Sequence, residues 1–372
     1  MKAMREATMD TGRPPRVLVV DDSALMRKLV SEILHDAGVE VVATARDGLD
    51  GLEKLLALEP DAVTLDLEMP RMGGIEFLRE AMRRRPTPIV VLSSLTDASA
   101  AATIECLELG AFECLHKPSG AISVDIARIG AAIVRTVQAA ARTDRSRLRA
   151  GRPEARGRRA ASPPPATAAP RPLGAGDAIL AIASSTGGPA ALQQVVPLLP
   201  ADLPAAVVVV QHLPVGFTKS LAASLDRNSA LAVTEAAPGE ALRTGAVLVA
   251  PAGQHTVFDA RGYARMTDDP PIHGVRPAAD VTLLSLAERF GRRVVAVVLT
   301  GMGKDGAAGA KAVRAAGGHV IAQDEATSVV YGMPKAAFDN GAANAVLPLD
   351  KIAAAADRAV RERAAAPVAR AS

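Results

Sequence analysis

Short apolar runs alternate with amphipathic stretches over the first 140 residues. Five runs rich in Val, Ile and Leu lie at 16–20, 39–45, 61–66, 88–93 and 111–116. A segment of helical length follows each run. This alternation predicts a five-stranded parallel sheet with helices on both faces. Functional groups are then expected at the carboxyl ends of the strands.

The same alternation resumes at about residue 178 and continues to about residue 363. Apolar runs typical of buried parallel strands lie at 178–183, 205–210, 246–250, 294–300 and 319–323. Segments that predict helices lie between several of them, at 191–199, 278–290 and 307–316. The pattern predicts a second α/β domain, which agrees with a length of 372 residues.

A segment of different composition, 141–177, joins the two periodic regions. It holds few large apolar residues and a proline-rich stretch, so it cannot bury enough surface to offset its chain entropy. Over 141–176, nine arginines and two acidic residues give a net charge of +7, which leaves −4 for the rest of a chain whose total is +3. We therefore assign domains to 15–140 and 178–365, with a solvated Arg/Pro/Ala-rich linker at 141–177.

Composition narrows the class of protein further. No apolar run approaches the roughly 20 residues that span a bilayer, and the first fifteen residues contain no signal-peptide pattern. We therefore expect a soluble, cytoplasmic protein with no membrane insertion. Cys106 and Cys114 have no metal-ligand spacing and are expected to be buried. Trp is absent and aromatic residues are few, so the basic linker does not predict nucleic-acid binding.

Polar groups stand at the predicted strand ends of the first domain. Asp21 and Asp22 follow the first strand, Asp66 and Ser93 end the third and fourth, and Lys117 follows the fifth. Clustered carboxylates repel one another unless a cation lies among them, and oxygen ligands suit Mg²⁺. A hydroxyl and an ammonium at the same edge would hold a phosphoryl group on Asp66. A single Asp after a strand is usually a helix cap or a turn residue, but the matched set favours a site.

The motifs VVDDSALMR and LDLEMPRM, with the pair Lys117-Pro118, resemble a response-regulator receiver domain over residues 15–140. The resemblance implies a flavodoxin-like fold, phosphorylation of Asp66, and a Mg²⁺ site made by Asp21, Asp22, Asp66 and the backbone carbonyl of Glu68. It also implies that Ser93 is the switch hydroxyl and that Lys117 contacts the phosphate.

Two positions depart from the receiver pattern. Gly73 stands where receivers commonly have Asp, and we expect this change to leave the chemistry untouched. Cys114 stands where a switch aromatic is usual, so the aromatic part of the family's switch is missing here.

The second domain offers a serine turn after its first strand. The strand ends in Ser184-Ser185-Thr186-Gly187-Gly188-Pro189, and a helical stretch follows. Glycines allow a sharp turn, Pro suits a first helical turn, and a serine there lies near exposed N–H groups. This would suit a nucleophile beside an oxyanion hole. Taken alone, the segment is better explained as an ordinary N-cap.

Four histidines are candidates for the general base. His319 precedes its strand and belongs to the opposite sheet edge, and His273 lies in a polar loop. His212 follows its strand by one residue and His255 lies five residues beyond a strand end, so both reach the expected edge. His212 is the better placed. Asp305, in the loop after 294–300, is the carboxylate that would orient and charge-stabilise the imidazole.

The order of these groups along the chain is Ser, His, Asp. The usual α/β-hydrolase order places the acid before His, and the G-x-S-x-G elbow is absent. A lipase-like fold is therefore disfavoured, and a Rossmann-like parallel-sheet hydrolase is preferred.

The stretches ASSTGGP, VVQHLP, LTGMGKDGA and QDEATSVVYGMPKAA resemble the catalytic domain of the CheB family of chemotaxis protein-glutamate methylesterases. The resemblance implies that Ser185 is the nucleophile, His212 the general base and acid, and Asp305 the orienting carboxylate. We prefer Ser185 to Ser184 because it directly precedes Thr-Gly-Gly.

The same resemblance implies that the backbone N–H of Met302 stabilises the oxyanion and that Thr186 supports the site, with no cofactor for the hydrolase. The implied substrate is a glutamate γ-methyl ester on the cytoplasmic bundle of a methylated chemoreceptor, with methanol as product. Deamidation of receptor glutamines is a second implied activity.

A chemotaxis histidine kinase is the implied phosphodonor. We expect the unphosphorylated receiver to lie over the Ser185 cleft and phosphorylation of Asp66 to weaken this packing. Two alternatives stay open. The second domain is a non-catalytic binding output of a response regulator, or the esterase serves a receptor pathway other than chemotaxis.

Overall fold

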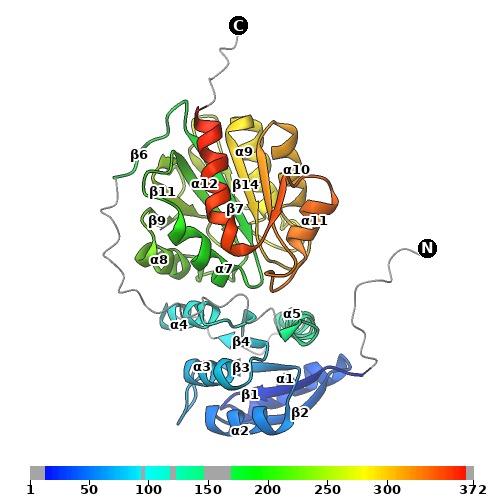
Figure 1. The fold of residues 1–372 in the computed structure, drawn as a ribbon. Coiled ribbons are helices and arrows are strands. Elements are labelled where there is room, and N and C mark those ends of the chain that lie inside the picture. The colour runs from blue at the N-terminus through cyan, green and yellow to red at the C-terminus, as the bar shows by residue number, and fades with distance from the viewer. Residues whose placement is uncertain (1–12, 94–96, 118–122, 146–168, 366–372) are drawn as a thin grey trace, which may run out of the picture. The chain divides into compact units, whose positions relative to one another are not determined.

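The computed structural model describes residues 13–93, 97–117, 123–145 and 169–365, without the side chains of 97–99 and 123–128. The chain divides into two compact units, Met1–Arg149 and Ala150–Ser372. Each unit is a parallel sheet between helical layers (Figure 1). The predicted fold class, two α/β domains with parallel sheets, is confirmed.

The first unit contains a five-stranded sheet in the order β2-β1-β3-β4-β5, in which every neighbouring pair is parallel. Its strands are β1 (Arg16–Val20), β2 (Glu40–Ala45), β3 (Ala62–Asp66), β4 (Ile89–Ser93) and β5 (Glu113–His116). Its helices are α1 (Ala24–Asp36), α2 (Gly48–Leu58), α3 (Gly74–Arg84), α4 (Asp97–Glu108) and α5 (Ser123–Ala141). Helices α1 and α5 pack together, while α2, α3 and α4 form a second layer.

The central strands of this unit carry its core. Every residue of β3 and β4 is buried, as expected for strands covered by helices on both faces. Helix α3 adds Phe77, Leu78, Ala81 and Met82 to the core. All five strands end at one edge, which is where the polar groups of this unit collect.

The second unit contains a seven-stranded parallel sheet in the order β16-β15-β14-β7-β8-β11-β9. Its strands are β7 (Ala178–Ser184), β8 (Ala205–Gln211), β9 (Ala232–Glu235), β11 (Ala246–Val249), β14 (Val294–Val298), β15 (His319–Gln323) and β16 (Ala345–Leu347). On one side of the sheet β7 is followed outward by β8, β11 and the edge strand β9, and on the other side β14 is followed by β15 and β16. The carboxyl ends of β7 and β14 therefore flank the switch point of the topology, where such sheets bind ligands.

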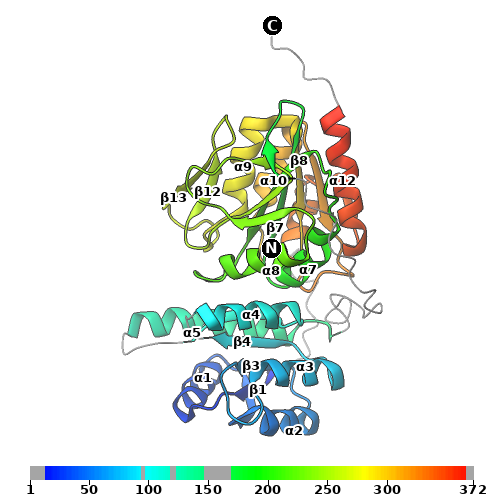
Figure 2. The same ribbon diagram turned by 90° about the vertical axis from the view of Figure 1, so that its left-hand side faces the viewer.

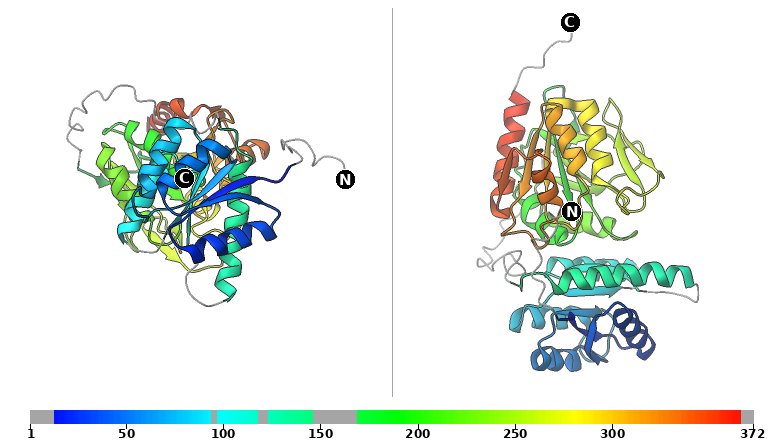
Figure 3. Two further views of the ribbon diagram at one scale, coloured as in Figure 1. Left: turned by 90° about the horizontal axis from the view of Figure 1, so that it is seen from below. Right: turned by 90° about the vertical axis from the view of Figure 1, so that its right-hand side faces the viewer.

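Helices cover both faces of this sheet. They are α7 (Gly188–Val195), α8 (Thr218–Asn228), α9 (Ala279–Phe290), α10 (Ala307–Ala315), α11 (Met333–Asp339) and α12 (Leu349–Ala365), with short 3₁₀ turns η1 (Val196–Leu198) and η2 (Gly291–Arg293). The right-hand view of Figure 3 places α12 on the face opposite α9 and α10. No helix in the described ranges is both long and apolar enough to cross a membrane.

A two-stranded antiparallel ribbon lies outside the main sheet. It pairs β12 (His255–Phe258) with β13 (Ala264–Thr267). Figure 2 shows the ribbon beside α9, against which β12 packs. The ribbon thus supports the helix whose amino end reaches the carboxyl edge of the sheet.

The structure describes residues 141–145 and 169–177 of the predicted linker. A short strand, β6 (Arg171–Pro172), pairs with β10 (Arg243–Thr244), and Arg171 forms an ion pair with Asp177. Residues 146–168 of the predicted linker lie outside the described residues, so the limits of the two domains stay a prediction.

Candidate active site and phosphoacceptor site

The two adjacent serines at the end of β7 have different surroundings. Ser184 is fully buried, and its hydroxyl donates to Gln211 Oε1 at 2.7 Å. Ser185 is the first residue beyond the strand, and its N–H donates to the Thr300 carbonyl at 3.0 Å. Its hydroxyl makes no hydrogen bond within the described residues. The structure therefore leaves Ser185, and not Ser184, with an uncommitted hydroxyl.

Glycines allow the close packing of this turn. A Cβ on Gly188 would lie 2.0 Å from Gln211 Oε1, and a Cβ on Gly301 would lie 2.8 Å from Ser185 Cβ. Neither contact is possible for a larger residue without displacing backbone or a buried side chain. Ser185 consequently lies against the loop that follows β14.

His212 and Asp305 form a direct pair. His212 Nε2 lies 2.7 Å from Asp305 Oδ2. Because an ionised carboxylate only accepts hydrogen bonds, Nε2 carries a proton, and in the neutral form of the ring Nδ1 then has the lone pair. Gln211 Nε2 donates to the carbonyls of both Ser185 and His212, at 2.9 Å each, and so ties the serine turn to the histidine. No hydrogen bond joins Ser185 Oγ to His212 in the part of the chain that the structure describes.

Asp305 is held by backbone amides. It is 2% exposed, and its Oδ1 accepts from the N–H groups of Asp280 (3.0 Å) and Gly306 (2.9 Å). Its Oδ2 accepts from Ala279 N–H at 2.6 Å as well as from His212. Burial raises the pKa of Asp305, but the hydrogen bond and charge of His212, with these amides, outweigh it and hold the pKa below its usual value. Asp305 is therefore a fixed, ionised partner of the imidazole.

Met302 and Thr186 adjoin the serine. Gly301 is fixed by its N–H bond to the Val330 carbonyl at 3.0 Å, and Met302 follows it. The Met302 N–H donates to no group among the described residues, and its role toward an oxyanion stays a prediction. The Thr186 carbonyl accepts from Thr300 Oγ1 at 2.9 Å, which ties the serine turn to the end of β14.

The other candidate histidines are placed differently. His255 is fully buried with both ring nitrogens engaged, which rules it out as the general base. His319 begins β15 and so lies at the amino edge of the sheet, as the sequence predicts. His273 Nε2 lies 3.1 Å from Asp280 Oδ2.

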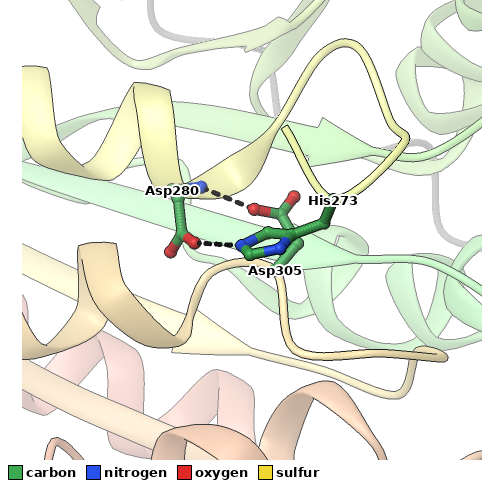
Figure 4. A group of neighbouring side chains, drawn as sticks. All are labelled: His273, Asp280 and Asp305. Atoms are coloured by element: carbon green, nitrogen blue, oxygen red, sulfur yellow. Dashed lines mark hydrogen bonds and ion pairs between the residues drawn. The ribbon is translucent and has the colours of Figure 1, made fainter. Parts of the chain in front are cut away.

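Figure 4 shows His273, Asp280 and Asp305 gathered in one cluster, with ligand atoms within 4.8 Å of one another. Asp280 Oδ1 already accepts from Gly309 N–H at 2.7 Å. Both Asp305 oxygens are occupied by amides and by His212. The cluster is therefore a hydrogen-bond network around the His212–Asp305 pair and not a vacant cation site.

Sequence reasoning missed two members of this site. Gln211 is a buried amide at the end of an otherwise apolar strand, and that contrast is a signal in the sequence. Asp280 stands in the first turn of α9, where it resembles any acidic residue near a helix start.

The phosphoacceptor groups of the first unit also meet. Asp66 ends β3 and is buried. Lys117 Nζ lies 2.7 Å from Asp66 Oδ1 and 3.0 Å from Asp21 Oδ2. Carboxylate oxygens of Asp21, Asp22 and Asp66 lie within 4.8 Å of one another.

These residues fit a divalent cation. Asp66 Oδ2 is buried and accepts no hydrogen bond from the described residues. Desolvation raises the pKa of Asp66 in spite of the opposing hydrogen bond and charge of Lys117. Asp21 and Asp66 thus share the ammonium of Lys117, and Asp22 adds a third carboxylate beside them. Oxygen donors with excess negative charge are what Mg²⁺ binds.

The remaining receiver residues lie around this cluster. Ser93 ends β4, is buried, and accepts from Thr103 Oγ1 at 3.0 Å. Its carbonyl accepts the Lys117 N–H at 2.9 Å. Glu68 is exposed two residues beyond Asp66, and the role of its carbonyl stays a prediction. Pro118 lies outside the described residues.

The two cysteines of this unit agree with expectation. Cys106 and Cys114 are both buried, and burial raises the pKa of each thiol. Gly73 is the N-cap residue of α3, and its lack of effect on the chemistry stays a prediction.

Comparison with known proteins identifies the family of each unit. The family model for the CheB methylesterase matches residues 180–356, and that for the response regulator receiver domain matches 17–125. A curated protein of Symbiobacterium thermophilum, named protein-glutamate methylesterase/protein-glutamine glutaminase, is 51% identical over 94% of this chain and 98% of its own. A protein of the same name from Pyrococcus abyssi is 43% identical over 94% of this chain and 95% of its own.

Among solved structures, the catalytic domain of Thermotoga maritima CheB methylesterase is 46% identical to this chain. It matches with a TM-score of 0.48 over 49% of this chain and 98% of its own. The relatives that align along nearly the whole chain confirm the resemblance seen in the sequence. The chain belongs to the family of protein-glutamate methylesterases/protein-glutamine glutaminases, in which a response regulator receiver domain is joined to a CheB methylesterase domain.

Proposed function

We propose that this protein is a phosphorylation-activated serine hydrolase that removes γ-methyl groups from glutamates of methylated chemoreceptors for chemotaxis adaptation. The observation that carries the proposal is the arrangement of Ser185, His212 and Asp305 at the carboxyl ends of β7, β8 and β14. Alignment along 94% of the chain with proteins named for this activity supports the same assignment.

The chemistry follows from the proton positions. His212 Nδ1 takes the proton of Ser185 Oγ as the oxygen attacks the ester carbonyl. The Met302 N–H stabilises the oxyanion that forms, and Thr186 keeps the serine turn in place. The imidazolium, stabilised by Asp305, then protonates the departing methoxide, which leaves as methanol.

A water molecule completes the reaction. His212 removes its proton, the resulting hydroxide attacks the acyl-enzyme, and Ser185 is released as the glutamate carboxylate forms. A receptor glutamine would follow the same steps with ammonia as the leaving group, so deamidation is part of the proposal. The hydrolase steps need no cofactor.

The receiver supplies the regulation. Asp66 accepts a phosphoryl group from a chemotaxis histidine kinase. Asp21, Asp22, Asp66 and the Glu68 carbonyl are the groups that would hold Mg²⁺, which would supply positive charge beside the phosphoryl oxygens. Lys117 and Ser93 contact the phosphate. Phosphorylation relieves inhibition of the hydrolase by the receiver.

The limits and location of the protein belong to the same proposal. We assign the receiver to 15–140, the linker to 141–177 and the hydrolase to 178–365, and we place the enzyme in the cytoplasm, where chemoreceptor bundles and kinases lie. The partners are these proteins, and neither nucleic acid nor membrane insertion is involved.

Release of methanol from methylated receptors tests the proposal. Wild type treated with a phosphodonor should release methanol, and Ser185→Ala should not. Equal release of methanol by the two proteins would exclude Ser185 as the nucleophile, and no release by wild type would favour a second domain that only binds. Hydrolysis of model esters without any action on chemoreceptors would point to another receptor pathway.

A further inference from the structure

His255 is a buried histidine that the proposed reaction does not use. Its side chain is fully shielded from solvent at the start of β12. Ring nitrogen Nδ1 accepts from the Ala278 N–H at 3.0 Å. Ring nitrogen Nε2 lies 3.2 Å from the Pro270 carbonyl oxygen. Both nitrogens are therefore engaged with backbone.

These two contacts fix the form of the ring. A backbone N–H can only donate, so Nδ1 carries no proton. A carbonyl oxygen can only accept, so Nε2 carries one. His255 is thus held as the neutral tautomer that is protonated at Nε2. Its Nδ1 accepts a hydrogen bond from Ala278, and its Nε2 donates one to Pro270.

The residue that donates to His255 Nδ1 is adjacent in the chain to the residues that bind Asp305. Ala278 precedes the first residue of α9, Ala279, whose N–H donates to Asp305 Oδ2 at 2.6 Å. The next N–H, of Asp280, donates to Asp305 Oδ1 at 3.0 Å. His255 therefore holds the peptide immediately before the two amides that orient Asp305, and Asp305 orients His212.

Further contacts tie β12 to the same helix. Thr282 Oγ1 donates to the Thr256 carbonyl at 2.7 Å, and the Phe258 N–H donates to Ser285 Oγ at 3.2 Å. These bonds fix α9 along its length whatever occupies position 255. The Ala278 bond differs from them because it acts at the amino end of the helix, next to Asp305.

We propose that His255 is a positioning residue for the hydrolase: its neutral imidazole fixes the amino end of α9 so that the Ala279 and Asp280 amides hold Asp305 against His212. The inference rests on the proposed function. It predicts that the acceptor at Nδ1 matters for turnover, whereas the donor at Nε2 matters only for stability.

A matched pair of substitutions separates the two ring nitrogens. His255→Asn places an amide oxygen near the position of Nδ1, so it keeps an acceptor for the Ala278 N–H and loses the donor. His255→Gln places an amide nitrogen near the position of Nε2, so it keeps the donor and loses the acceptor. His319→Gln, at the other sheet edge, is the control for replacing a half-buried histidine.

The experiment measures methanol release by the phosphorylated full chain, together with unfolding in urea. We expect His255→Gln to lower kcat about tenfold with KM unchanged, the loss that follows from one misplaced hydrogen bond. We expect His255→Asn to stay within about threefold of wild type in kcat, although both variants lose stability. Equal kcat in the two variants, or a wild-type kcat in His255→Gln, would overturn the inference.

A second readout does not depend on turnover. The Nε2 proton that His212 shares with Asp305 should give a downfield NMR resonance in wild type and in His255→Asn. The resonance should move upfield or vanish in His255→Gln, and its persistence there would contradict the inference. If these resonances differ as expected while no variant releases methanol, the proposed function fails and the positioning role stands.

Discussion

Replacing Asp305 by asparagine removes a charge and one acceptor oxygen while it preserves size. In wild type, each carboxylate oxygen accepts from two donors: Oδ1 from Asp280 and Gly306, and Oδ2 from Ala279 and His212. Whichever way the new amide turns, its NH₂ group faces two donors. The substitution therefore loses two hydrogen bonds in either orientation.

The expected loss of stability in Asp305→Asn follows from the two lost hydrogen bonds. A hydrogen bond to a charged group contributes roughly 1.5 kcal/mol, so losing two costs about 3 kcal/mol of unfolding free energy. The effect on turnover is larger, because the imidazole loses the acceptor that fixes its tautomer. A triad whose aspartate becomes asparagine loses about 10⁴-fold in kcat, and we expect a loss of that order here.

The neighbouring carboxylate provides a matched control. Asp280 Oδ1 accepts from the Gly309 N–H, and Oδ2 lies 3.1 Å from His273 Nε2 (Figure 4). In Asp280→Asn the carbonyl can still accept from Gly309 and the NH₂ can donate to a neutral His273. We expect kcat within about threefold of wild type and a stability loss below about 1 kcal/mol.

The assay is steady-state methanol release by both variants, with urea unfolding of the same samples. A decrease of less than tenfold in Asp305→Asn would refute the role of the carboxylate. An equal loss in Asp280→Asn would show that any disturbance of this buried cluster stops turnover.

The pH dependence of stability tests whether the pKa of Asp305 is lowered in the folded protein. The folded pKa of Asp305 lies below its usual value of 3.8, so its stabilising contribution is fully present above pH 3.8 and is lost as the pH falls through the folded value. The difference in unfolding free energy between wild type and Asp305→Asn should not shrink between about pH 7 and pH 5. It should shrink as the pH falls below 3.8. Shrinkage already between pH 7 and pH 5 would contradict the lowered pKa.

Three further predictions concern the serine pair, the cation site and the domain coupling. Ser184→Ala should keep methanol release and lose about 1 kcal/mol of stability with its bond to Gln211; loss of release would show that Ser184 is the nucleophile. Mg²⁺ at ten times its Kd for the wild-type receiver should raise the free energy of unfolding of the receiver by about 1.4 kcal/mol. In Asp22→Ala, thermal unfolding should show little stabilisation by the same Mg²⁺ concentration, because the exposed Asp22 side chain is expected to act only as a ligand of the cation. A chain starting at Pro170, which keeps β6, should release methanol faster than the unphosphorylated full chain, and an equal rate would exclude inhibition by the receiver.

Much of the fold followed from the hydrophobic pattern. The apolar run at 16–20 is β1, and the run at 319–323 is β15, residue for residue. Such runs are readable because a strand buried on both faces must be apolar throughout. The edge strands β9 and β16 and the ribbon β12–β13 were missed. Strand β16 is apolar but only three residues long, and the other three strands are four residues long and mix apolar with polar residues.

The candidate site was predictable in its side chains and not in its backbone partners. The carboxyl edge of a parallel sheet brings Asp66 to Lys117 and His212 to Asp305, because strand order alone fixes those positions. The sequence carries no information on which amides face Asp305. The predicted position of His255, in a loop near the edge, also could not show that its ring is buried against the Ala278 N–H.

Identification of the residue that reacts with a fluorophosphonate tests the central claim most directly. In this reaction a serine oxygen displaces fluoride from phosphorus, so only an activated serine is labelled. Mass spectrometry of the treated full chain should place the adduct on Ser185, with labelling greatly reduced in His212→Ala. An adduct on Ser184, or labelling of Ser185 that does not depend on His212, would contradict the account.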